Sequence, residues 1–332
     1  MRRLACILAA SVLLGAGPAD AVILQDPVNA APEDGEAWEF RGAWQAFAED
    51  VFNNEKRAAC SPLLVSDPEC ANFVTTRSLY VVEGRGRWSL GEGTGFELHV
   101  PAMFVLQDDA GDFLPPGVPP QAFGLGDLRL VLARDLLRDS YRGLVTRLRA
   151  NLPPNPSPLG LQTVNCVQRD GQGNVITGPD GREITLTSRI EWAAPSVDLR
   201  MVGHQDFPEA DLQLVGSLGA NVPFRRQVTD TLVQWRGLAF EGGAGVTWRP
   251  LRLAAFHLEA LGFWSNPFEE DRRVLCETGG QRIDLAPGLT FRVTEGIDIW
   301  GVVRVPAYYG GYWREWSSYD LLLGIRTASW QP

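Results

Sequence analysis

Charged side chains recur at every second position in several segments of this chain. Glu83, Arg85 and Arg87 fall on one face of such a segment, and Glu97 and His99 do so in the next. A period of two places side chains on one side of an extended strand. Carboxylate, guanidinium and imidazole groups gathered in this way could form ion pairs, bind a charged solute or, around a histidine, transfer protons.

Acid-base catalysis would have to use one of three histidines, His99, His204 and His257. None of them lies in a recognisable nucleophile motif, and a GxSxG sequence is absent. His99 and His257 could pair with Glu97 and Glu259, but a polar network is the more ordinary role for such residues. We therefore predict that the protein is not an enzyme and uses no cofactor.

The composition argues against two further classes of partner. The net charge is -10 with a pI near 4.9, and no block of lysine and arginine occurs, so we expect no nucleic acid partner. The cysteines lack a close CxxC pair and histidines are few, so we expect no metal site.

The N-terminal segment MRRLACILAASVLLGAGPADA has the features of a secretory signal. Two arginines precede an apolar stretch from Leu4 to Leu14, and Ala19 and Ala21 flank Asp20. We predict a signal peptide over residues 1–21 and a single domain over residues 22–332. Cys6 lies too early in the apolar run for a lipoprotein site, so no lipid anchor is expected.

The remaining chain has no apolar segment long enough to cross a membrane as a helix, but it has about twelve candidate strands. In residues 297–305, for example, isoleucine, glycine and valine alternate with Asp298, Trp300, Val302 and Arg304. A soluble sandwich or a membrane barrel could produce this local alternation. The predicted strands are 37–48, 77–88, 94–105, 125–134, 141–152, 195–203, 211–221, 237–248, 252–263, 281–292, 297–306 and 318–328.

The connections between these strands separate the two architectures. Odd-numbered connections are long, whereas even-numbered ones are short, as in SLGEG, RPL and TEG. Bacterial outer-membrane barrels have short periplasmic turns and longer extracellular loops, and a soluble sandwich has no reason to alternate in this way. We therefore predict an all-β fold, an antiparallel transmembrane β-barrel of about twelve strands, in the outer membrane of a Gram-negative bacterium.

The facing of each strand then assigns the charged residues to the lumen. A mid-bilayer arginine on the lipid face would cost about 2 to 4 kcal/mol, so the charged face of each strand must point inward. We predict lumen-lining roles, with influence on selectivity, for Glu83, Arg85, Arg87, Glu97, His99, Asp127, Arg129, Arg147, Arg149, Asp198, Arg200, His257, Glu259, Asp298 and Arg304.

All four cysteines that follow the signal fall in long connections. An exported protein meets an oxidising compartment, so we expect disulfides among Cys60, Cys70, Cys166 and Cys276. Cys60 with Cys70 is the nearest pairing, which leaves Cys166 with Cys276, although three connectivities are open.

Many of the 11 tryptophans lie near predicted strand ends, including Trp38, Trp88, Trp248, Trp264 and Trp330. Girdles at the two membrane interfaces use aromatic residues in this way, and packing in a soluble core is the alternative.

Two stretches resemble the outer-membrane proteins grouped with the meta-pathway phenol-degradation proteins, many described as transporters. One is GLGDLRLVLARDLLRDSYRGLVTRLRANLPPNP, a Gly-Leu-Gly-Asp hairpin that ends in a proline-containing loop. The other is IDLAPGLTFRVTEGIDIWGVVRVPAYYGGYWREWSSYDLLLGI, which is similar to that family's closing strands. The chain departs from the family in a larger third loop, where GPDG favours a hairpin turn, and in its SWQP ending.

The resemblance implies an outer-membrane channel or transporter for small, hydrophobic or aromatic, molecules. The alternative is a structural or surface-binding barrel whose lumen is closed by side chains. The expected partners are outer-membrane lipid, a small-molecule solute and the barrel-assembly machinery during biogenesis.

Overall fold

The structure, a computed structural model, is dominated by antiparallel strands. It describes residues 30, 32, 35–47, 76–108, 121–153, 161–167, 177–179, 181, 185–191, 194–229, 232–235, 237–251, 253–267, 269–270, 273–274, 280–294, 296–311 and 319–327. Within these residues, no helix is long and apolar enough to cross a membrane.

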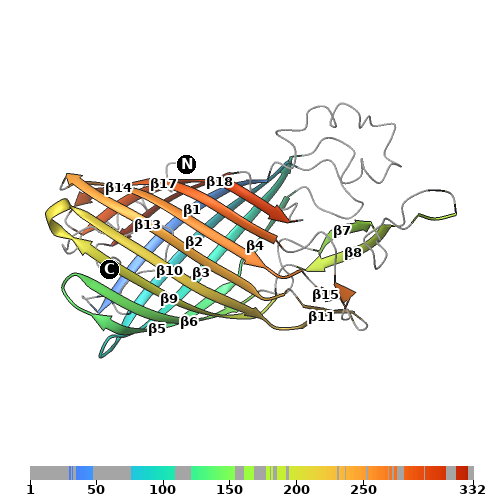
Figure 1. The fold of residues 1–332 in the computed structure, drawn as a ribbon, viewed down its shortest axis with the longest axis horizontal. Coiled ribbons are helices and arrows are strands. Elements are labelled where there is room, and N and C mark those ends of the chain that lie inside the picture. The colour runs from blue at the N-terminus through green and yellow to red at the C-terminus, as the bar shows by residue number, and fades with distance from the viewer. Residues whose placement is uncertain are drawn as a thin grey trace.

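The principal sheet closes into a barrel (Figure 1). Barrel strands that follow one another in the chain are paired, except β4 and β5, which both pair with β3. β1 also pairs with β19, and β2 pairs with both β1 and β3, which closes the ring. Closure satisfies the backbone groups of every strand without a free edge, which is the condition for crossing a bilayer as strands. The barrel strands are β1 Glu36–Phe47, β2 Thr76–Gly91, β3 Thr94–Asp108, β4 Gln121–Leu125, β5 Leu128–Arg138, β6 Arg142–Leu152, β9 Ser196–Phe207, β10 Leu212–Pro223, β13 Ala239–Leu251, β14 Ala254–Ser265, β17 Gly280–Thr294, β18 Ile297–Gly311 and β19 Tyr319–Thr327.

The predicted twelve-stranded barrel is confirmed, with one local difference. The predicted strand 125–134 is divided into β4 and β5, which both pair with β3, so the 13 sheet segments occupy twelve positions around the barrel. The interruption falls at Gly126 and Asp127, where the Gly126 amide donates to the Pro101 carbonyl at 2.8 Å. A proline in β3 has no amide to give to this neighbour, so the pairing is irregular here.

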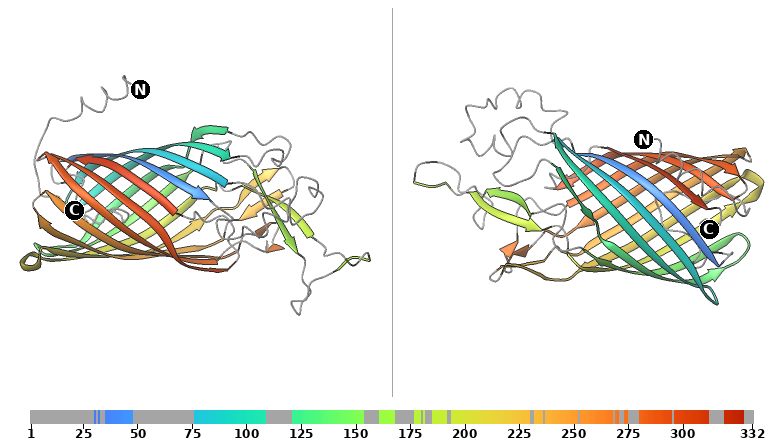
Figure 2. Two further views of the ribbon diagram at one scale, coloured as in Figure 1. Left: turned by 90° about the horizontal axis from the view of Figure 1, so that it is seen from above. Right: turned by 180° about the vertical axis from the view of Figure 1, so that it is seen from behind.

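Short turns join the strands at one end of the barrel, which we call the short-turn end (Figures 1 and 2). Gly91, Glu92 and Gly93 all have positive φ, a conformation that glycine adopts without strain. The turn from β5 to β6 is fixed by Asp139, whose Oδ1 accepts the amides of Tyr141 and Arg142 at 2.9 Å. The Arg142 guanidinium also donates to Asp139 and lowers the pKa of that exposed carboxyl.

Longer connections leave the opposite end, the long-loop end, and several carry strands of their own. β7 Leu161–Val167 pairs with β8 Thr185–Glu191 in the third long connection, and the Gly181 amide donates to Gly178 at 2.9 Å, as expected for the GPDG turn. A small sheet contains β11 Arg226–Thr229, β12 Leu232–Trp235, β15 Glu269–Glu270 and β16 Arg273–Val274. At the short-turn end, by contrast, a short 3-10 helix, η2 Pro208–Ala210, joins β9 to β10.

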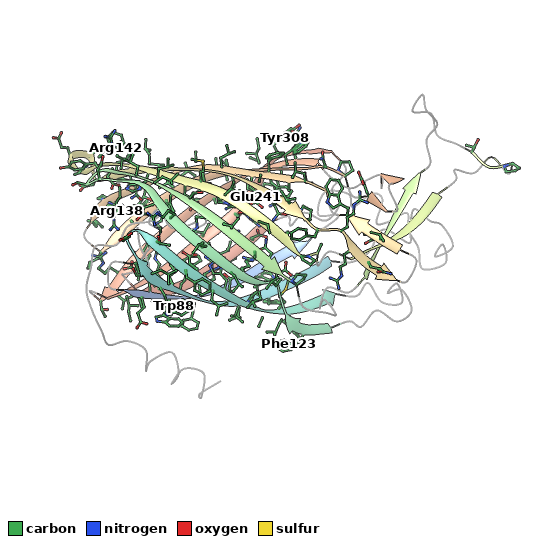
Figure 3. The ribbon with its side chains drawn as sticks, turned by 90° about the horizontal axis from the view of Figure 1, so that it is seen from below. Trp88, Phe123, Arg138, Arg142, Glu241 and Tyr308 are labelled. Carbon is green, nitrogen blue, oxygen red and sulfur yellow. The ribbon has the colours of Figure 1, made fainter. Side chains whose placement is uncertain are left out.

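The outward face of the barrel is apolar. Trp88, Phe123 and Tyr308 point away from the wall in Figure 3. Exposed outward side chains include Val82, Leu132, Leu148, Leu199, Met201, Leu218, Leu258, Leu285, Leu289, Val303 and Leu323. An apolar face this extensive on a closed barrel matches a lipid environment.

Aromatic side chains mark two levels on the outward face. In each of four strands, two aromatic residues lie eight positions apart: Tyr80 and Trp88, Phe96 and Phe104, Phe240 and Trp248, and Phe256 and Trp264. Neighbouring rings pack together, as in Trp88 with Phe96 at 5.8 Å and Phe240 with Trp264 at 5.6 Å between centroids. Eight residues span about 26 Å of strand, or about 20 Å of height at a tilt near 40°. This spacing fits the apolar band of a barrel, roughly 25 Å tall.

Four of the tryptophans predicted to lie near strand ends occupy these levels. Trp88, Trp248 and Trp264 belong to the pairs named above, and Trp38 packs edge-on against Trp88 with 5.2 Å between ring centroids. Trp330 lies outside the described residues.

We expect Leu148→Arg to lower the free energy of unfolding by about 2 to 4 kcal/mol, because this exposed side chain lies at mid-height of β6. Leu152→Arg, at the end of the same strand, is the matched control and should cost about 0 to 1 kcal/mol. Denaturant unfolding in lipid vesicles measures both. Equal costs for the two variants would contradict the lipid-facing assignment of β6.

Candidate functional site: the barrel lumen

The inward face of the strands carries the charged residues. Along β2, Glu83, Arg85 and Arg87 are buried, whereas the intervening residues belong to the outward face. β3 repeats the pattern with Glu97 and His99. Because period-two alternation holds around the barrel, side chains from many strands meet in one enclosed space.

Every residue predicted to line the lumen is buried or partly buried. The buried ones are Glu83, Arg85, Arg87, Glu97, His99, Arg147, Asp198, His257, Glu259 and Asp298. The partly buried ones are Asp127, Arg129, Arg149, Arg200 and Arg304. Asp127 differs from the others in lying at the interruption between β4 and β5.

Glu97 is the centre of one ion-pair cluster near the short-turn end. Its carboxylate forms ion pairs with Arg87, at 2.8 Å, and with Arg147. His99 approaches the same carboxylate at 3.2 Å. These groups come from β2, β3 and β6, so the cluster joins separate parts of the wall.

Trp300 lies beside this cluster. Its indole Nε1 donates to Glu39 at 3.1 Å, and Arg85 approaches the other oxygen of Glu39 at 3.3 Å. The ring covers Gly324, where a Cβ atom would collide with the indole. Trp300 also packs with Ala286, Val302 and Leu322, which form an apolar patch on the inner wall of β17, β18 and β19.

Polar contacts fill the rest of this half of the lumen. His257 lies between the hydroxyls of Thr247 and Thr290, at 2.9 and 2.8 Å. Asp298 has Arg292 at 3.5 Å and Arg326 at 4.0 Å. We call this half of the lumen the turn-side lumen. Its side chains are almost completely buried, and they include Glu39, Arg87, Glu97, Arg147, His257, Asp298 and Trp300.

A segment before β1 contributes to the same closure. The Ala30 amide donates to Asp135 Oδ1 at 2.7 Å, and Ala30 is fully buried against Ala133 and Val145. These partners belong to the inward faces of β5 and β6, so Ala30 lies inside the barrel at the short-turn end.

Glu83 links this region with the other half. Its carboxylate forms ion pairs with three arginines: Arg41 at 3.0 Å, Arg129 at 3.5 Å, and Arg85. His99 Nδ1 lies 3.7 Å from the same carboxylate. Glu83 is therefore surrounded by cationic and imidazole groups from β1, β2, β3 and β5.

Towards the long-loop end the lumen becomes more open. Arg304 pairs with Asp320 and approaches Asp284 at 3.6 Å, and Arg282 also pairs with Asp284. On another part of the wall, Arg200 of β9 pairs with Glu241 of β13. We call the region around Arg41, Arg129, Arg304 and Glu241 the loop-side lumen. All four of these side chains keep part of their surface exposed.

Sequence reasoning missed several members of these networks. They are Glu39, Arg41, Glu241, Arg282, Asp284, Trp300, Asp320 and Arg326. All of them continue the period-two pattern of predicted strands, so the rule that already places Trp300 on the face of Asp298 could have found the others in β1, β13, β17 and β19. For Ala30, no alternating pattern in the sequence predicts its contact with Asp135.

The three histidines have different partners in the structure. His99 contacts glutamates, His257 contacts threonine hydroxyls, and His204 lies 3.6 Å from Asp206 near the short-turn end. No group of three His, Cys, Asp or Glu side chains suited to a metal occurs among the described residues. Cys60, Cys70 and Cys276 lie outside those residues, and only the backbone of Cys166 is described, in β7, so the disulfides stay a prediction.

Comparison with known proteins supports the fold. No protein-family model matches the sequence, and no curated protein matches it. Among solved structures, the chain is similar to a COG4313 outer membrane channel from Pseudomonas putida F1, with a TM-score of 0.60 at 8% identity over 93% of this chain and 99% of that one. The chain thus has the fold of an outer-membrane β-barrel.

Two further matches have lower scores. The NanC porin has a TM-score of 0.45 at 10% identity, over 87% of this chain and 98% of that one. A TodX monoaromatic hydrocarbon channel mutant has a TM-score of 0.44 at 9% identity, over 92% of each chain.

We expect Arg147→Met to destabilise the barrel, because it removes one of two guanidinium partners from the buried Glu97. Adding Glu97→Gln to Arg147→Met should recover part of the lost free energy of unfolding, because position 97 then no longer carries a buried carboxylate without its Arg147 partner. Unfolding free energies of the two single variants and the double variant form the test cycle. Additive effects of the two substitutions would show that the pair is not coupled.

Proposed function

We propose that the protein is a bacterial outer-membrane channel or transporter for small molecules. The observation that carries this proposal is the change in exposure along the lumen. Charged side chains of the loop-side lumen keep exposed surface, whereas those of the turn-side lumen are almost completely buried. A polar vestibule that narrows to a constriction is an arrangement that could admit and select solutes.

The proposed orientation places the short-turn end in the periplasm and the long-loop end outside the cell, as in bacterial barrels generally. Outer-membrane lipid would contact the apolar outward face, and the barrel-assembly machinery would act during biogenesis. Residues 1–21 would serve as the export signal of this Gram-negative protein.

Hydrophobic or aromatic solutes are the finer part of the proposal. The patch of Ala286, Trp300, Val302 and Leu322 makes one inner wall apolar, and Leu322 is the member that keeps part of its surface exposed. Arg41 and Arg129, which approach Glu83 and keep part of their surface exposed, would contact the polar part of such a solute. The fifteen lumen residues predicted from the sequence are proposed to influence selectivity through this contact.

A structural barrel with a closed lumen is the second candidate. The buried ion pairs of the turn-side lumen and the insertion of Ala30 favour it, because they fill the cross-section with side chains and backbone. The two candidates differ in whether solutes pass.

We expect the purified protein to conduct ions in planar bilayers, and Trp300→Ala to raise the single-channel conductance. The reason is that the indole occupies the turn-side lumen above Gly324. Ile299→Ala, on the outward face of the same strand, is the matched control and should leave conductance unchanged. Silence of the wild type and of both variants, with normal assembly, would reject the channel in favour of the closed barrel.

A further inference from the structure

The two signs of charge are not equally accessible in the loop-side lumen. The Arg129 and Arg304 side chains are 32% and 26% exposed. The carboxylates that they contact are much less so, with 4% for Glu83, 7% for Asp284 and 0% for Asp320. At these ion pairs, a solute that enters the region therefore meets the guanidinium groups before the acids beneath them.

The difference follows from how the ion pairs are built. Glu83 receives three arginines, Arg41, Arg85 and Arg129. A carboxylate has two oxygens, whereas each guanidinium has five N–H donors in a planar fork. One buried acid is thus enclosed by several arginines, of which Arg41 and Arg129 keep part of their surface exposed.

The exposed arginines also gather around one section of the lumen. Arg41 and Arg129 both approach Glu83, at 3.0 and 3.5 Å. Arg149 and Arg304 also lie on the inward face and keep part of their surface exposed. These residues come from β1, β5, β6 and β18. Like charges that share an enclosed lumen repel one another, and an anion between them would relieve that repulsion.

Glu241 is the exception in this region. Its side chain is 37% exposed, and it pairs with Arg200 of β9. It provides an accessible acid with which the effect of the arginines can be compared.

We infer that the loop-side lumen selects small organic anions, above all carboxylates, over neutral or cationic molecules of the same size. The planar fork of arginine matches a carboxylate with two parallel hydrogen bonds, which favours this chemistry over a simple halide. The inference rests on the proposed channel function and adds the class of solute to it.

The test uses three probes with the same ring and different charge: benzoate, benzamide and benzylammonium. Liposomes that contain the full-length protein should take up benzoate fastest and benzylammonium slowest. In planar bilayers, the reversal potential in a KCl gradient should indicate a preference for chloride over potassium.

The variant Arg129→Gln with Arg304→Gln should lower the ratio of benzoate to benzamide uptake by about fivefold, the effect of losing roughly 1 kcal/mol of charge interaction in a wet lumen. Glu241→Gln removes one charge of the opposite sign and should raise that ratio. Arg142→Gln, at the exposed β5–β6 turn, should leave it unchanged.

The wild-type order of uptake decides the inference even if a variant does not assemble. Uptake without charge preference, or with preference for benzylammonium, would overturn the anion selectivity and leave the channel intact. Absence of both uptake and conductance would reject the channel itself, and the selectivity with it.

Discussion

Closure of the sheet is the constraint on which the rest of this structure depends. Pairing of β2 with both β1 and β3 leaves no gap in the barrel wall, so backbone groups are satisfied without water. Once the ring is closed, each strand has one face for lipid and one for the lumen. The charged residues then have a single tolerable direction, because a charge on the lipid face is costly.

That inward direction creates a second problem, which the ion pairs solve. A buried charge is unfavourable unless it is paired and hydrogen-bonded. Glu97 between Arg87 and Arg147, and Glu39 between Arg85 and Trp300, show how neighbouring strands supply the partners. In the turn-side lumen, ion pairs and hydrogen bonds consequently connect strands that are far apart in the sequence. In the loop-side lumen, some arginine side chains keep part of their surface accessible.

The similarity to an outer-membrane channel at 8% identity shows how little of the sequence this architecture specifies. Alternation, turn chemistry and aromatic levels are compatible with many different lumen residues. The outward face must meet lipid in every such barrel, whereas the inward face is free to vary. Any functional difference between such barrels is therefore to be sought in the lumen, and here that means the arrangement of arginines and carboxylates.

The sequence by itself determined the strands, their number and their facing. These follow from local rules: alternation along 297–306 assigned Asp298, Trp300 and Arg304 to one face, and glycine-rich turns such as Gly91 to Gly93 marked the strand ends. Only the tertiary structure decided which inward charges meet. The pairing of Trp300 with Glu39 joins residues 261 positions apart, and the contact of Ala30 with Asp135 joins residues 105 positions apart. Such contacts depend on barrel closure and on the stagger between strands, which no local pattern encodes.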